Sequence, residues 1–101
     1  MIEYVPFDLA KLWLRVDTDD LDPAIRIAIL AASGLCANYL KSAAVWEKTE
    51  DVPPPVQAAT LIMLGTLFRD PDGADAANWQ QGFLPFPVMN LLYPLRDPAL
   101  S

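Results

Sequence analysis

The chain has no histidine and only one cysteine, Cys36, among its 101 residues. Without histidine it lacks the side chain that most often serves as a general base or metal ligand near neutral pH. A single cysteine cannot form an intramolecular disulfide, which disfavours a secreted scaffold held by disulfides. Because Cys36 falls in step with Ile25 and Ile29 at helical spacing, we interpret it as a small buried residue rather than a reactive thiol.

Basic residues are also few. Seven Lys and Arg face thirteen Asp and Glu, a net charge of −6, and the basic residues stand singly along the chain. This distribution disfavours binding of nucleic acid, which needs a patch of basic side chains. The four glycines are scattered, so no glycine-rich phosphate loop is present, and no Ser or Cys stands beside a recognisable base. We therefore expect neither an enzyme nor a bound cofactor.

The acidic turn DTDDLD, which begins at Asp17, invites a calcium-binding interpretation. An EF-hand loop starting there would need an oxygen ligand at Leu21, glycine at Asp22 and glutamate at Ala28, and the chain meets none of these requirements. We expect no metal site in this turn. The turn instead predicts a helix that is capped by Asp22 and has Pro23 at its first position.

Targeting signals and long apolar runs are likewise lacking. The N-terminus MIEYVPFD is acidic and has no basic region followed by an apolar run, so a signal peptide is not expected. No uncharged apolar segment reaches the roughly 18 residues that a membrane span requires, and the nearest, 52–68, opens with three prolines. We expect a protein that is soluble and intracellular where it is made.

The pattern that is present is helical. Apolar residues make up 53% of the chain, and none of the alternation typical of strands has strand length. Helices are expected at 6–15, 23–41, 54–68 and 88–92, with a solvated connector at 42–55 that includes Trp46, a loop at 71–82 and an extended Pro-rich segment at 83–87. The sequence thus predicts a single all-α domain over 1–101, a bundle of three or four helices.

Two of the expected helices have informative apolar patterns. In the first, Leu9, Leu12 and Trp13 form one apolar stripe. The third, 54–68, has almost no polar face, which indicates a helix surrounded on most sides. It is either the central core helix of the domain or a helix that neighbouring copies of the chain partly cover.

Three segments carry a resemblance to a known family. LAKLWLRVD, from Leu9 to Asp17, is similar to an opening helix of the pattern E-A-K-x-x-L-R-[IV]-D, with Leu9 in place of the acid. Val-Pro-Pro at 52–54 matches a Val-Pro entry to an apolar helix that ends here in Phe-Arg at 68–69. LPFPVMNLLYPLR at 84–96 is similar to L-P-x-G-V-x-x-L-L-x-P-[YF]-R, with Pro87 for the glycine and Leu95 for the aromatic residue.

In this order the segments resemble the head–tail connector family of long-tailed bacteriophages, small helical head-completion or adaptor proteins. The resemblance implies a ring of about a dozen copies below the portal that joins capsid to tail and continues the DNA channel. The implied partners are the chain itself, the portal protein and tail-completion or neck proteins, while DNA passes through without specific binding. The implied location is the neck of the virion, after synthesis in the host cytoplasm.

A ring built head to tail needs two different contact faces on each subunit. We expect the C-terminal segment to contact a neighbour or the portal, and the end of the first helix to form a second surface. The candidate residues are Phe83, Leu84, Phe86 and Val88 in the first and Trp13 and Arg15 in the second. The alternative is that these side chains only close the core of the subunit itself.

A different class of function stays open, that of a small acidic helical module that binds or regulates another protein. A mimic of DNA would carry rows of carboxylates along a helix. Here the acidic residues gather in the expected turns, at 17–22, 47–51 and 70–75. This placement disfavours mimicry of DNA but not other forms of binding.

Overall fold

The computed structural model describes residues 2–69 and 86–95, and in them the chain forms four α-helices and no strand. The helices are α1 (Phe7–Leu14), α2 (Asp22–Leu40), α3 (Pro54–Arg69) and α4 (Phe86–Leu92), with short 3₁₀ turns at Lys41–Ala43, Thr49–Asp51 and Tyr93–Leu95. The predicted all-α bundle is therefore confirmed. The loop predicted at 71–82 lies outside the described residues.

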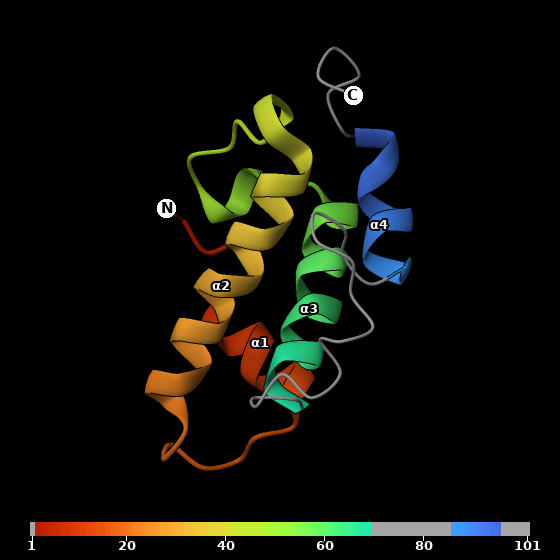
Figure 1. Cartoon of the computed structure of the whole chain (residues 1–101). Helices are drawn as coiled ribbons and strands as arrows, with labels where there is room; N and C mark the ends of the chain where they lie inside the picture. Colours follow the sequence, from red (N-terminus) through yellow and green to blue (C-terminus); the bar gives the residue numbers. More distant parts are fainter. Residues whose placement is uncertain (1, 70–85, 96–101) are drawn as a thin grey trace.

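Helix α3 is the centre of the bundle. It packs against α2 on one side and α4 on the other, and α1 lies against the C-terminal part of α3 (Figure 1). Its fully or largely buried residues are Val56, Ala59, Thr60, Leu61, Met63 and Leu64. The helix begins within the proline run, at Pro54, where a missing N–H costs nothing. The prediction of a helix surrounded on most sides is confirmed.

Helix α2 supplies the other half of the core. Its buried residues are Ile25, Ile29, Ala32, Ser33, Cys36 and Leu40, which include most of the predicted face. Burial raises the pKa of the Cys36 thiol to about 11, and the Thr60 hydroxyl lies 3.8 Å from its sulfur. Cys36 is thus a neutral core residue, as predicted.

By length and composition α2 is also apolar enough to cross a membrane, with a mean hydropathy of 1.4 over its most apolar window. The core helix of a soluble protein passes the same test. In this bundle one face of α2 is buried against α1, α3 and α4.

The start of α2 differs from the prediction. Asp22 is the first helical residue rather than the cap, Leu21 holds the cap position, and no side chain caps the helix. The Asp22 carboxylate instead takes part in a tertiary ion pair, since Lys11 Nζ of α1 lies 2.9 Å from Asp22 and 2.8 Å from Asp19. Hydrogen bonds to Asp19 and then to Asp22 raise the pKa of Lys11. The acidic turn is therefore tied to α1 by one lysine.

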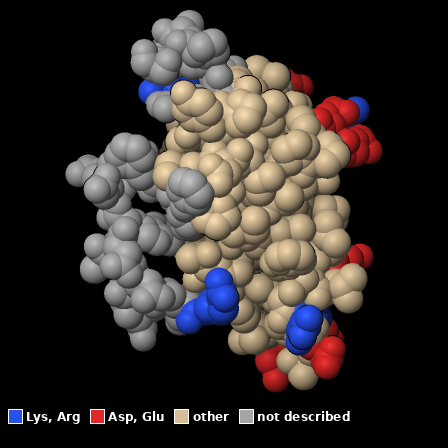
Figure 2. Space-filling model, turned by 90° about the vertical axis from the view of Figure 1, so that its right-hand side faces the viewer, with Lys and Arg blue, Asp and Glu red and all other residues tan. Residues whose placement is uncertain are grey.

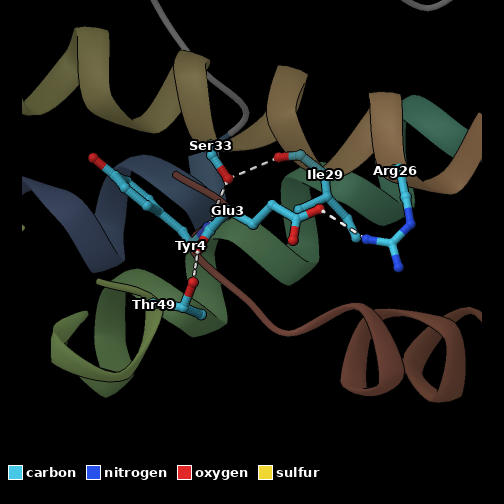
Figure 3. A network of polar contacts seen from close by, with 6 residues as sticks. All are labelled: Glu3, Tyr4, Arg26, Ile29, Ser33 and Thr49. Carbon is cyan, nitrogen blue, oxygen red and sulfur yellow. Dashed lines mark hydrogen bonds and ion pairs between the residues drawn. The ribbon is translucent and has the colours of Figure 1, made fainter. Parts of the chain in front are cut away.

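The N-terminal segment lies between α2 and the connector (Figure 3). The Tyr4 N–H donates to Ser33 Oγ at 2.9 Å, and the Ser33 hydroxyl donates to the Ile29 carbonyl at 2.7 Å. On the other side, Thr49 Oγ1 donates to the Glu3 carbonyl at 2.7 Å. These bonds join three parts of the chain that are distant in sequence.

The connector was expected to be solvated, and for Trp46 this prediction was wrong. The Trp46 ring is half-buried and meets the Tyr4 ring edge to face, with centroids 5.8 Å apart. An indole gains more by covering an aromatic neighbour than by facing water. The connector is consequently held against the rest of the chain near the C-terminal end of α2.

The last helix begins earlier than predicted. Phe86 is the first residue of α4 and Pro87 the second, although 83–87 was expected to be extended. A proline in the first turn has no hydrogen bond to lose, so it starts a helix without cost. Val88 and Leu92, one helical turn apart, are fully buried and anchor α4 to the core.

Candidate interaction surface

Helix α1 presents its larger apolar side chains to solvent. Leu9, Leu12 and Trp13 are 39%, 75% and 51% exposed, whereas Ala10 is fully buried. The predicted stripe thus exists but faces outward. The small Ala10 side chain lets the helix approach α2 and α3 closely, which leaves the bulkier residues on the outer face.

The end of α1 turns sharply at Arg15. This residue adopts the left-handed conformation, with φ 59° and ψ 40°, and its N–H bonds to the Leu12 carbonyl. A left-handed residue is the common way to end a helix, usually with glycine. Here the residue is arginine, and its exposed side chain lies beside the outer face of α1.

Two hollows flank Trp13. The first has a volume of about 410 Å³, and the second has a volume of about 380 Å³. The first is lined by Trp13, Leu14, Ile62, Gly65, Phe68 and Arg69, and the second by Leu9, Leu12, Trp13 and Arg15. The indole edge lies over α3, since a Cβ added to Gly65 would lie 3.6 Å from Trp13 Nε1. Trp13 therefore forms a ridge between two open hollows.

Each hollow contains one arginine. Arg15 and Arg69 are the only charged residues that line them among the described residues, and neither makes an ion pair within that part of the chain. Arg69 Nε donates to the Gly65 carbonyl at 3.2 Å, which holds the guanidinium at the edge of the hollow. We call Leu9, Leu12, Trp13, Arg15 and Arg69 the Trp13 surface.

Charged side chains are unevenly distributed over the described surface. Figure 2 looks onto the side of the molecule that carries α4, where the middle of the described surface is free of charged side chains and these lie toward its lower end and its edges. The Trp13 surface combines exposed apolar side chains with arginines that have no ion pair to any described residue, and apolar groups with arginine are the composition of a protein interface. Its chemistry is that of contact and recognition.

The predicted site residues divide into three groups. Trp13 and Arg15 are exposed and adjacent, as a contact surface requires. Phe83 and Leu84 lie outside the described residues, and of Phe86 only the backbone, at the start of α4, is described. Val88 is fully buried in the core of the chain, in agreement with the alternative that these side chains close the core of the chain itself.

Sequence reasoning missed the contribution of α3. Gly65, Phe68 and Arg69 form one wall of the larger hollow. The available signal was the glycine within an otherwise bulky apolar helix, which marks a place where another element approaches closely. Nothing in the sequence indicated that this element is the tryptophan of α1.

No metal site appears in the described ranges 2–69 and 86–95, where no three His, Cys, Asp or Glu side chains are grouped closely enough to hold an ion. Comparison of the chain with models of known protein families, with curated proteins and with solved structures found no match.

Proposed function

We propose that the chain is the subunit of a phage head–tail connector, which forms a ring below the portal, joins capsid to tail and continues the DNA channel. Two lines of support meet here. Three segments in the correct order resemble that family, the first of them in α1 and the third in α4. The four-helix architecture agrees with a small helical adaptor.

The observation that carries the proposal is the exposed Trp13 surface. Burial of a leucine side chain contributes about 1.5–3 kcal/mol, and a tryptophan at an interface is often a hot spot. The described part of the chain leaves both Leu12 and Trp13 at least half exposed, 75% and 51%. Such a patch beside two hollows is typical of a surface that a partner covers.

Acidity favours the same function. A channel that conducts DNA must not bind it, and a net charge of −6 disfavours contact with phosphates. The proposed partners are further copies of the chain, the portal and the neck or tail-completion proteins. The proposed location is the virion neck.

The test is assembly on a portal. Purified protein is mixed with portal rings, including the portal encoded beside it, and the product is imaged by electron microscopy and weighed by native mass spectrometry. We expect a ring stacked on the portal. A protein that stays monomeric and binds no portal would refute the proposal and favour the small acidic binding module.

Substitutions connect the test to the structure. Trp13→Asp is expected to prevent assembly, because it places a charge at the centre of the apolar patch. The matched control is Ile27→Asp, which charges a more exposed apolar position on α2, 69% against 51% for Trp13. Circular dichroism of both variants checks that each remains helical.

A further inference from the structure

We infer that the Trp13 surface of one subunit binds the segment 42–55, which links α2 to α3, in a second copy of this chain. The contact is head to tail. The inference deepens the proposed function, on which it rests, by naming the two surfaces that join the ring. The second surface consists of Val45, Glu47, Glu50 and Asp51 and is called the connector edge. All four residues are exposed, Val45 at 71%.

The two surfaces have complementary chemistry. The Trp13 surface carries apolar side chains between two arginines. The connector edge carries one apolar side chain and three carboxylates, and Lys48 is the only basic residue between Val45 and Asp51 in the sequence. Among the described residues, no ion pair involves Arg15, Arg69, Glu47, Glu50 or Asp51. Arginine and carboxylate form charge-assisted hydrogen bonds, often two in parallel, which fix the orientation of a contact as well as strengthening it.

The connector edge is also preorganised. Thr49 is bonded to Glu3, and Trp46 packs on Tyr4. A 3₁₀ turn, Thr49–Asp51, fixes the backbone that bears two of the carboxylates. A surface already held in place loses little conformational entropy on binding.

Position decides that the contact joins two subunits. Figure 1 places α1 and the C-terminal end of α3 at one end of α2, and the connector at the other. Helix α2 has 19 residues, about 28 Å at 1.5 Å per residue. The two surfaces are held at different levels along this helix, so they do not meet within one chain. A contact between different surfaces of identical chains is heterologous, and such contacts close into rings when the rotation per subunit allows it.

Charge reversal tests the pairing. We expect the double variant Arg15→Glu with Arg69→Glu, and separately Glu47→Lys with Glu50→Lys, each to weaken association of the full-length protein by about tenfold or more. An equimolar mixture of the two variants restores opposite charges at every contact, so association is expected to recover. Native mass spectrometry and sedimentation measure the association of each variant alone and of the mixture. Recovery distinguishes a direct pairing from loss of folding.

A cross-link tests the geometry. Chains with Leu12→Cys are mixed with chains with Val45→Cys under mild oxidation, alone and on the portal, with buried Cys36 left in place. We expect mixed disulfide dimers in clear excess over dimers of either variant with itself. Rings that form on the portal without this cross-link and without sensitivity to charge reversal would overturn the inference but leave the proposed function intact. A mixed cross-link without any portal complex would refute the proposed function but leave the pairing of the two surfaces intact.

Discussion

Replacement of Arg15 by glycine is expected to raise the stability of the isolated protein while it weakens assembly. Arg15 ends α1 in the left-handed conformation, which costs a residue with a Cβ about 1–2 kcal/mol. Glycine adopts it freely but loses more backbone entropy on folding, about 0.5–1 kcal/mol. The Arg15 side chain is exposed, and no ion pair to it exists among the described residues. The net expectation is stabilisation by roughly 0.5–1 kcal/mol.

For a chain of this size, 1 kcal/mol changes the melting temperature by about 4–8 °C. Arg15→Gly should therefore raise the melting temperature of the isolated protein by roughly 2–8 °C, as measured by circular dichroism or calorimetry. Arg15→Ala is the control, because it removes the same guanidinium but keeps the left-handed strain. A glycine variant that melts below the alanine variant would refute this account of the turn. Both variants should assemble more weakly than the wild-type chain, since both lose the charge.

Three further predictions concern two core residues and the contact of Gly65 with Trp13. Ser33→Ala leaves the buried Tyr4 N–H without a partner and should lower the free energy of unfolding by about 1–3 kcal/mol, as measured in urea; an unchanged value would contradict the bond to Ser33. Gly65→Ala should be neutral or stabilise the fold by up to about 1 kcal/mol, because the new methyl group meets Trp13 at ordinary contact distance. Gly65→Leu should instead displace Trp13 and shift its fluorescence emission to longer wavelength. The thiol pKa of Cys36 is higher in the folded chain, about 11 against an ordinary 9.0, so the stability it contributes is complete below pH 9 and is lost as the pH rises toward 11. Cys36→Ala should flatten that part of the stability–pH profile, and an unchanged slope would mean that the thiol is not the group responsible.

The helices of the core were predictable because their patterns are unambiguous. The segment 54–68 has no polar face, so no choice of orientation was needed, and α2 repeats Ile25, Ile29, Ala32 and Cys36 along one side. Apolar periodicity is the signal that sequence reasoning uses best. These two helices alone determine the class of the fold.

The orientation of α1 was not predictable on the same grounds. Leu9, Leu12 and Trp13 form one apolar stripe, while Phe7, Ala10 and Leu14 form another, and periodicity alone does not choose between them. The structure turns the second toward the core, with Ala10 buried and Phe7 and Leu14 partly buried. Which large side chains remain exposed, and therefore the candidate site, follows from that choice.

Contacts between segments that are distant in sequence were also not predictable from local sequence patterns. Lys11 pairs with Asp22, and Trp46 covers Tyr4. Each pairs residues from different elements, so local patterns carry no trace of it. In both places the tertiary contact overrode a sound local rule about capping or solvation.

The most direct test of the account is whether assembly covers Trp13. In a chain with Trp46→Phe and Trp79→Phe, Trp13 is the only tryptophan, and its half-exposed ring should emit at long wavelength in the free protein. Titration with the portal is expected to shift this emission to the blue as the ring forms. A complex that forms without any change in Trp13 emission would contradict the assignment of the Trp13 surface to the interface.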